Sequence, residues 1–528
     1  MLSSAYGFNG GVSAPHRAAA LAGRDVIAAG GSAVEAMVAA AATISVAYPH
    51  MNGIGGDGFW IIHRPGHAPV AISGCGRAAG LASPAWYAER GVQEALPTRG
   101  ALAALTVPGT IAGWRAALAH CPKGNRVPLG DLLAHAIALA EDGIGVTDNQ
   151  ARTTRDKLDG LRDVPGFAET FLPDGAPPAP GHRLRQPALA RTLAHLASAG
   201  LEEYYRGDIA RSHARFLEDA GSPLRLADFE AFEAGVAAPL TTTLRAGQIW
   251  NTGAPTQGVS SLMILGILDR LRVTQAEGFA HLHGLIEATK LAFLRRNAEL
   301  GDPDHMRVPA QDWLAPEALD ALSAQLDRTK ARPWPEVAKP GDTIWMGAAD
   351  ADGCVVSFIQ SVFWEFGSGL VFPETGVFFQ NRGAGFSLAP GPNQLRPHAR
   401  PFHTLNPALA RLTNGRVLAY GTMGGEGQPQ TQGAVFSRYA MFGQDLQAAI
   451  TAPRWLLGKT WGAATTSLKL EDRFDPALVT ALAAAGHEIE MIGPYSDLAG
   501  HAGGVAYHPD GLIEVASDPR SDGAALGF

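Results

Sequence analysis

The segment from residue 343 to residue 360 predicts a β-hairpin at the start of a strand-rich final third of the chain. Residues 343–349 are apolar, residues 350–353 (Asp-Ala-Asp-Gly) have the chemistry of a turn, and residues 354–360 resume a strand-like pattern. Helical patterns dominate the part before it, at residues 33–48, 132–141, 188–196, 279–300 and 316–326. A helix-rich front and a strand-rich back favour an α+β fold built in layers.

Thr343 begins the first strand of this hairpin, and the pairing places a second hydroxyl beside it. Two positions of the turn fit the pattern, one pairing Thr343 with Gln360 and the other pairing it with Val362, and Ser361 lies next to Thr343 in both. If the chain were cut before Thr343, the new α-amine, with a pKa near ~8, would serve as the general base for its own hydroxyl. A threonine at the start of a strand is ordinary in itself, so this function needs further evidence.

The composition is that of a globular protein without a nucleic-acid partner. Of the 528 residues, 46% are hydrophobic and 17% are charged, which suits a large core. The formal net charge is −8 and no basic stripe stands out, so nucleic-acid binding is not expected. The three cysteines, Cys75, Cys121 and Cys354, are too few and too widely spaced for a disulfide framework or a cysteine-rich metal site.

No segment predicts export or membrane insertion. Residues 1–11 lack a basic region followed by an apolar stretch, so we expect no secretory signal and a cytoplasmic protein. Residues 33–48 form the most apolar helix candidate, but this stretch contains Glu35, is too short for a bilayer and ends at Pro49. We expect it to be a buried core helix.

Two tempting motifs are interpreted as structural. Residues 53–58 (Gly-Ile-Gly-Gly-Asp-Gly) have the spacing of a dinucleotide-binding loop, but a helix precedes them and a strand follows, the reverse of the required order. We expect close backbone packing at a sheet edge there. His281 and His283 suggest a metal, but we recognise no carboxylate or histidine after the pair at helical ligand spacing, so no metal site is predicted.

Five blocks in order resemble the gamma-glutamyltransferase family of N-terminal-nucleophile hydrolases. They are residues 30–37 with 49–59, 107–113, 207–210, 287–293 with 301–303, and 421–425. The resemblance covers nearly the whole chain. It implies a four-layer αββα sandwich.

The resemblance also implies a self-cleaving precursor and a catalytic site. In that family the chain is cut before a threonine that opens a strand, so the expected scission lies between Asp342 and Thr343. Thr343 would then be the nucleophile and Ser361 the second hydroxyl. Gly424 and Gly425 match the paired glycine amides of the oxyanion hole, where backbone N–H groups stabilise the developing alkoxide.

The implied products are two chains that stay in one folded domain. Residues 1–342 would form the large subunit, ending in a proline-rich and charged linker at about 329–341, and residues 343–528 would form the small subunit. Whether the processed heterodimer assembles further into a homo-oligomer is left open.

The chain differs from true gamma-glutamyltransferases at the positions where those enzymes bind the glutamyl group of the substrate. The acidic residue that binds the substrate in those enzymes is replaced here by Gly385. Their pair of serines is replaced by His403 and Thr404. Without that carboxylate, no counter-ion for a substrate ammonium is evident. Basic residues stand in neighbouring blocks instead, and arginine suits a bidentate grip on a carboxylate. The expected substrate-binding residues are Arg77, Arg382, Arg400, His403 and Thr404.

Residues 363–369 and 400–406 resemble the branch of the family that contains oxamate amidohydrolases, which act in purine and allantoin breakdown. The resemblance implies hydrolysis of a small carboxylate-bearing amide, oxamate to oxalate and ammonia, without a metal or cofactor. Two alternatives stay open. One is a hydrolase or transferase of gamma-glutamyl peptides such as glutathione, and the other is an unprocessed, inactive binding protein.

Overall fold

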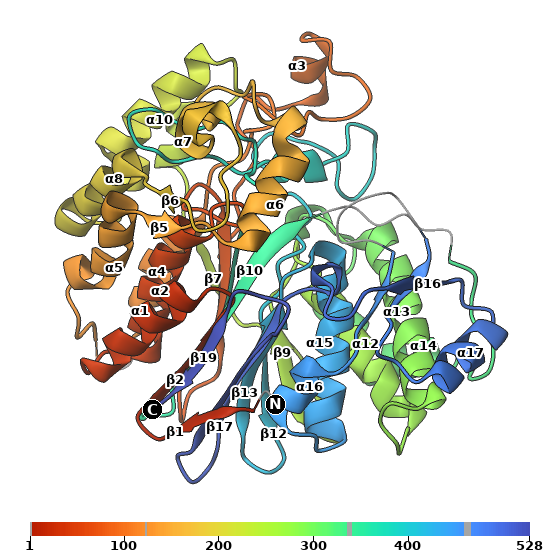
Figure 1. Ribbon diagram of the computed structural model, residues 1–528. Helices are drawn as coiled ribbons and strands as arrows, with labels where there is room; N and C mark the ends of the chain where they lie inside the picture. The colour runs from red at the N-terminus through yellow and green to blue at the C-terminus, as the bar shows by residue number, and fades with distance from the viewer. Residues whose placement is uncertain (1–2, 122–123, 335–340, 459–465) are drawn as a thin grey trace.

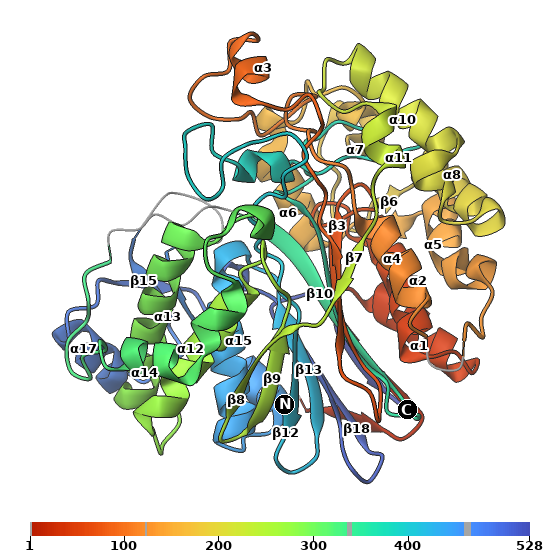
Figure 2. The same ribbon diagram turned by 180° about the vertical axis from the view of Figure 1, so that it is seen from behind.

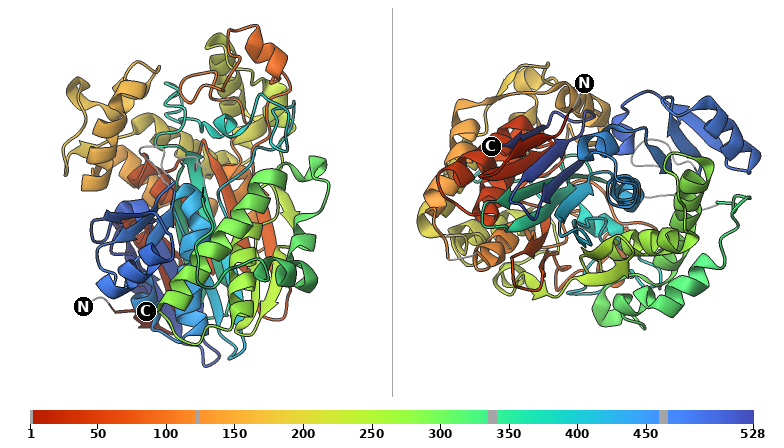
Figure 3. Two further views of the ribbon diagram at one scale, coloured as in Figure 1. Left: turned by 90° about the vertical axis from the view of Figure 1, so that its right-hand side faces the viewer. Right: turned by 90° about the horizontal axis from the view of Figure 1, so that it is seen from below.

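Two antiparallel sheets lie face to face between two layers of helices in the computed structural model (Figures 1 and 3). The structure describes residues 3–121, 124–334, 341–458 and 466–528. The predicted α+β fold with four αββα layers is confirmed.

The sheet that contains the predicted hairpin has seven strands, with the hairpin strands in its interior. Its order is β19, β2, β10, β11, β3, β4 and β7. The bounds are β19 Ala524–Gly527, β2 Gly10–Ala14, β10 Asp342–Asp350, β11 Val355–Phe363, β3 Asp57–His63, β4 Val70–Gly74 and β7 Gly235–Ala237.

The facing sheet also has seven strands, in the order β1, β18, β17, β13, β12, β9 and β8. The bounds are β1 Ala5–Gly7, β18 Ile513–Ser517, β17 Ala502–Tyr507, β13 Val417–Thr422, β12 Ala408–Leu412, β9 Gly247–Asn251 and β8 Leu240–Leu244. Each sheet therefore takes strands from both sides of residue 342. The strand-rich back predicted from the sequence is thus only part of the β structure.

Helices cover the outer face of each sheet (Figures 1 and 2). The β10 sheet carries α1 Arg17–Ala28, α2 Ala33–Ala47, α4 Thr110–Leu118, α5 Leu129–Asp142 and α8 Pro187–Ala199. The other sheet carries α12 Gly258–Leu271, α13 Phe279–Glu299, α14 Pro316–Ser323, α15 Gln428–Phe436, α16 Leu446–Thr451 and α17 Pro476–Ala484.

Shorter elements complete the described chain. The remaining helices are α3 Pro84–Ala88, α6 Asp148–Lys157, α7 Phe167–Phe171, α9 Glu203–Arg206, α10 Asp208–Asp219 and α11 Leu226–Glu230. A three-stranded sheet contains β14 Trp455–Leu457, β15 Leu468–Glu471 and β16 Ile489–Ile492, and β5 Ile144–Gly145 pairs with β6 Arg183–Leu184.

Alternation along β10 divides its side chains between two cores. Ile344, Met346 and Ala348 join the core beneath the α1 and α2 layer, whereas Trp345 and Ala349 join the core between the two sheets. A strand buried on both faces has no polar side, which explains its nearly continuous apolar sequence.

Helix α2 is fully buried, as the sequence predicts. Its first turn has a capping box in which Ser32 and Glu35 satisfy each other's backbone groups. Among the described helices, none is long and apolar enough to cross a membrane. Of the predicted linker, residues 329–334 contain neither helix nor strand, and residues 335–340 lie outside the described residues.

Candidate active site

Thr343 lies at one end of the β10–β11 pair and faces the inter-sheet side of its sheet. It shares strand parity with Trp345, and its side chain is fully buried, with an exposed fraction of 0%. Ile344 pairs with Gln360 and Asp342 pairs with Phe363, so Ser361 and its successor oppose the single residue Thr343 in a β-bulge. The observed turn lies between the two predicted registers, because Gly353, at φ 79°, closes a three-residue loop. The structure thus places Ser361 beside Thr343.

The residues around the expected scission pack directly against the glycine pair. A Cβ on Gly341 would lie 3.4 Å from the Cα of Gly425 and 3.3 Å from Cε2 of Phe363. Gly424 and Gly425 both have positive φ, at 121° and 50°, which glycine adopts without strain. Among the described residues, neither the Gly424 nor the Gly425 N–H group donates a hydrogen bond. Two unengaged backbone donors beside the chain before Thr343 suit an oxyanion hole.

Gln257 joins the glycine pair to the neighbouring loop that contains Thr404. Its Nε2 donates to the carbonyl of Gly425 and to that of Thr404, both at 2.8 Å. Arg296 in turn donates to Oε1 of Gln257 at 2.8 Å and forms a buried ion pair with Glu426 at 2.6 Å. This buried polar network fixes the carbonyl side of the loop, so the N–H groups can face the scission point.

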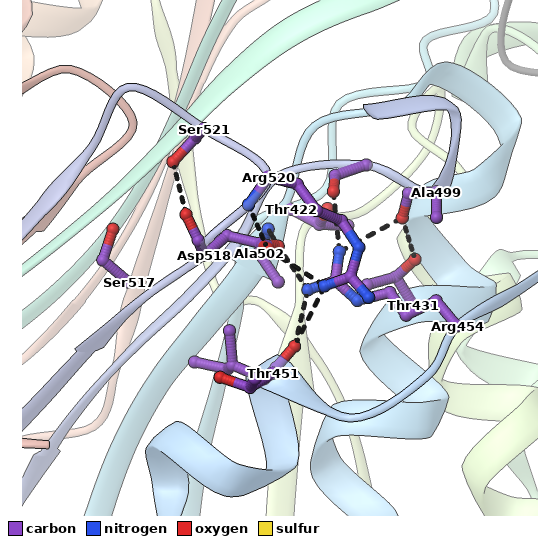
Figure 4. Close-up of polar contacts among 12 residues, drawn as sticks. Thr422, Thr431, Thr451, Arg454, Ala499, Ala502, Ser517, Asp518, Arg520 and Ser521 are labelled. Carbon is purple, nitrogen blue, oxygen red and sulfur yellow. Dashed lines mark hydrogen bonds and ion pairs between the residues drawn. The ribbon is translucent and has the colours of Figure 1, made fainter. Parts of the chain in front are cut away.

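A second buried network supports the strand segment that precedes the glycine pair (Figure 4). Arg454 forms an ion pair with Asp518 and donates to the carbonyls of Ala499 and Gly500, at 3.2 and 2.6 Å. Gly500 packs so closely on Met423 that a Cβ there would lie 2.5 Å from the Met423 carbonyl oxygen. Arg454 therefore holds the residues against which Met423, the neighbour of Gly424, is packed.

Arg382 is a buried arginine with spare hydrogen-bonding capacity. Its exposed fraction is 1%, Nη2 donates to Oγ1 of Thr404 at 3.1 Å, and the guanidinium lies 3.7 Å from the ring centre of Phe363. Nε and Nη1 have no hydrogen-bond partner among the described residues. Burial lowers the pKa of Arg382 to about 9. A buried cation with two unsatisfied donors is costly unless an anion binds there.

Gly385 explains why no acidic side chain from this loop satisfies Arg382. A Cβ at position 385 would lie 3.9 Å from Cδ of Arg382. An aspartate or glutamate there would stand next to the guanidinium and neutralise it. The missing carboxylate noted in the sequence thus leaves a cationic site.

His403 contacts Asp57, and its hydrogen bonds identify which ring nitrogen carries the proton. His403 Nδ1 accepts from the N–H of Leu405 at 3.4 Å, so the proton of this neutral ring is on Nε2, which donates to Oδ2 of Asp57 at 2.9 Å. Burial lowers the pKa of His403 well below its usual range. Both ring nitrogens are engaged in these contacts, and the role of His403 in substrate binding stays a prediction.

The other carboxylate oxygen of Asp57 accepts three more hydrogen bonds. Oδ1 accepts from Nε2 of Gln380 at 2.9 Å and from the N–H groups of Gly76 and Gly109, both at 3.1 Å. Burial raises the pKa of Asp57 to about 7, and these hydrogen bonds and the charge of Arg382 oppose that rise. Because all the surrounding groups donate, the arrangement suits the ionised carboxylate.

The other two predicted arginines already have partners. Arg77 is partly exposed and donates to the carbonyl of His398 at 2.9 Å, with Asp304 3.7 Å away. Arg400 pairs with Asp302 at 3.1 Å and with Asp304 at 2.7 Å. The structure therefore favours Arg382 among the three as the arginine available to a ligand, and the roles of Arg77 and Arg400 stay predictions.

Sequence reasoning passed over Asp57, although it interpreted the surrounding glycines. A Cβ on Gly56 would lie 2.1 Å from the Ser361 carbonyl oxygen, so the glycines pack closely, as expected. That packing is against the interior strand β11, however, and not at a sheet edge. A lone carboxylate at the start of a largely apolar strand was the available signal. For Gln257 the sequence offered no such signal, because the residues that it contacts lie far away in the sequence.

Comparison with known proteins agrees with this arrangement. The profile of the gamma-glutamyltranspeptidase family matches residues 19–528. The chain belongs to the gamma-glutamyltranspeptidase family. Its relatives include the oxamate amidohydrolase proenzyme of Klebsiella pneumoniae, 51% identical in an alignment that covers 100% of both chains. The glutathione hydrolase-like YwrD proenzyme of Bacillus subtilis is 36% identical over 98% of both chains.

A solved structure shows the same architecture throughout. Cephalosporin acylase from Bacillus halodurans has a TM-score of 0.92 at 30% identity, covering 100% of this chain and 97% of that chain. Relatives of this gamma-glutamyltranspeptidase family member are thus named as amidohydrolases, hydrolases and acylases, two of them as proenzymes. The chain is an enzyme of this hydrolase family.

Proposed function

We propose that this protein is a self-processing amidohydrolase that converts oxamate to oxalate and ammonia through an N-terminal threonine. The observation that carries the substrate class is Arg382, which is buried beside Thr404 and Phe363 with two donor nitrogens unsatisfied. A carboxylate fits this fork, whereas a substrate ammonium finds no carboxylate at Gly385. The 51% identity to an oxamate amidohydrolase proenzyme supports this small anionic amide as substrate.

Processing begins with the bond before Thr343. The Thr343 hydroxyl attacks the carbonyl carbon of Asp342, and the Gly424 and Gly425 N–H groups stabilise the alkoxide. Collapse breaks the peptide C–N bond as the nitrogen takes the hydroxyl proton, which frees the Thr343 α-amine and leaves Asp342 as an ester on Thr343 Oγ. Water hydrolyses this ester, releasing the Asp342 carboxylate and regenerating the Thr343 hydroxyl. The products are a large chain ending at 342 and a small chain beginning at 343.

Turnover repeats the same chemistry on the substrate. Arg382 holds the oxamate carboxylate, and the Thr343 α-amine takes the hydroxyl proton as Oγ attacks the amide carbonyl. The protonated amine then gives that proton to the departing nitrogen, so ammonia leaves and an oxalyl ester remains. Water, deprotonated by the α-amine, hydrolyses the ester to oxalate. Ser361, beside Thr343, is proposed to orient the nucleophile. The cytoplasmic location expected from the sequence stays a prediction.

Replacing Thr343 by alanine should leave the chain uncut and inactive, because the nucleophile for both reactions is lost. Intact-mass analysis of the wild type should show fragments that end at 342 and begin at 343. Thr343→Ser is the matched control, since it keeps a hydroxyl, and it should still be processed. A wild-type chain that stays full length on prolonged incubation would support the inactive binding protein instead.

Arg382→Met should lower kcat/KM for oxamate about 100-fold or more, because two charge-assisted hydrogen bonds to the carboxylate are lost. It should also raise Tm, since a buried cation without a counter-ion is removed. Ammonia release from oxamate is compared with turnover of glutathione and gamma-glutamyl-p-nitroanilide. Faster wild-type turnover of either gamma-glutamyl compound than of oxamate would contradict the proposal.

The matched control for stability is Arg438→Met. Arg438 is as buried as Arg382 but pairs with Glu277 at 2.6 Å. Its loss should lower Tm, because it leaves a carboxylate unpaired. Opposite shifts in the two variants would distinguish an uncompensated cation from a structural ion pair.

Gly385→Asp should abolish oxamate hydrolysis while leaving self-cleavage intact. The new carboxylate would pair with Arg382 and exclude the substrate anion, and Gly385 does not have the positive φ that would strain a side chain. Gly385→Ala tests the added volume without the charge and should retain most activity. Equal losses in the two variants would show that steric exclusion, and not charge, is responsible.

Arg454→Met should lower kcat about tenfold or more with little change in KM, because the glycine donors act mainly on the transition state. The route is the support that Arg454 gives to Gly500, and through it to Met423 beside Gly424. Self-cleavage should slow in parallel. If Arg438→Met changed kcat equally, general destabilisation would account for the effect.

A further inference from the structure

A second cluster of buried ionisable side chains lies where α13 meets the loop before β16. His283 and Glu287 come from α13 and His487 from the loop, and their exposed fractions are 1%, 3% and 6%. One ligand atom from each lies within 4.8 Å of the others. Glu287 is nine residues before Arg296, so the cluster is about 14 Å along the helix from the polar network under the glycine pair.

The dismissal of a metal at this place from the sequence was wrong in one respect. Glu287 follows His283 by four residues, which puts both on one face of the helix at a spacing used by metal ligands. His281 does not take part, because its Nε2 contacts Oγ of Ser437 at 2.9 Å. The third member, His487, lies 204 residues from His283 in sequence, so no local pattern could reveal it.

Hydrogen bonding prepares His283 as a ligand. Its Nε2 lies 2.8 Å from the carbonyl oxygen of Asp327, which only accepts, so the ring proton is on Nε2 and the Nδ1 lone pair faces the cluster. A backbone carbonyl that orients a histidine in this way is the usual outer partner of a metal-bound imidazole. His283 Nδ1 and His487 Nε2 are 2.9 Å apart, and tetrahedral zinc needs about 3.3 Å between nitrogens, a small opening.

Lys290 is the competing cation. Its ammonium lies 2.7 Å from Oε1 of Glu287 and donates to the carbonyl of Arg332 at 2.5 Å. A bound ion would displace it from the carboxylate. Lys290 has room to move, because it and His487 line a cavity of about 320 Å³.

We propose that His283, Glu287 and His487 form a site for one divalent metal ion of the zinc class, linking the large and small chains. The linking role rests on the proposed processing, since His283 and Glu287 precede residue 343 and His487 follows it. Two imidazoles and one carboxylate suit zinc, and the cavity leaves the fourth position for water. The ion would act in holding the two chains together, away from the threonine chemistry.

The test measures zinc binding by full-length protein that has been stripped with a chelator, using competition with a chromophoric chelator and metal analysis after dialysis. One zinc per chain is expected, and His283→Gln and His487→Gln should each weaken binding at least tenfold. His281→Gln, a buried histidine on the same helix outside the cluster, is the matched control and should bind as the wild type does. Zinc uptake that is equal in all four proteins would overturn the proposal.

Zinc binding by Lys290→Met distinguishes a metal site from a polar cluster with only a structural role. Removing the competing ammonium should tighten zinc binding about tenfold or more, whereas unchanged or absent binding in this variant would contradict the site. Added zinc should raise Tm in both the processed protein and the uncut Thr343→Ala variant. Binding that persists in the uncut variant separates this site from the proposed catalytic function.

Discussion

The antiparallel pairing of β10 with β11 is the constraint on which the rest of the molecule depends. It places Thr343 at the end of a strand in the interior of a sheet, buried on both faces and opposite Ser361. The strand can reach that position only because the front of the chain supplies β2 on one side and β3 beyond β11. Since the sheet mixes both halves of the chain, a cut before residue 343 would leave the two products held by shared strands and a shared core.

Electrostatics then decide what the end of this strand can bind. Within the described residues, Arg382 is desolvated and forms no ion pair. The buried carboxylate whose charge acts on it, Asp57, accepts hydrogen bonds from backbone amides, Gln380 and His403. The resulting imbalance favours a small anion. Such a cation costs stability unless an anion binds beside it, which is the physical ground for the proposed role of Arg382.

The loop that contains Gly424 and Gly425 is held by contacts to its carbonyl groups, whereas the N–H groups of these two glycines make none among the described residues. Gln257 binds the Gly425 carbonyl, while Arg454 and Asp518 secure the segment packed on Met423. These contacts hold the carbonyl of Gly425 and the residue before Gly424, and Gly425 packs against Gly341 in the chain before Thr343. In the proposed mechanism, preorganisation of this kind would avoid reorganisation when the alkoxide forms, so support far from the reacting atoms would affect the rate.

Local sequence determined a good part of this description. Strand alternation and turn chemistry predicted the hairpin and put Ser361 beside Thr343, and an apolar run predicted the buried helix α2. The missing carboxylate at Gly385 came from the resemblance to the family and not from local pattern. Only the tertiary structure decided which arginine is available, because Arg77, Arg400 and Arg382 look alike in sequence and differ in the distant groups that pair with them. The same holds for Asp57 with His403 and for His283 with His487. Residue type and spacing report short-range geometry, whereas the partner of a buried charge is set by packing between segments hundreds of residues apart.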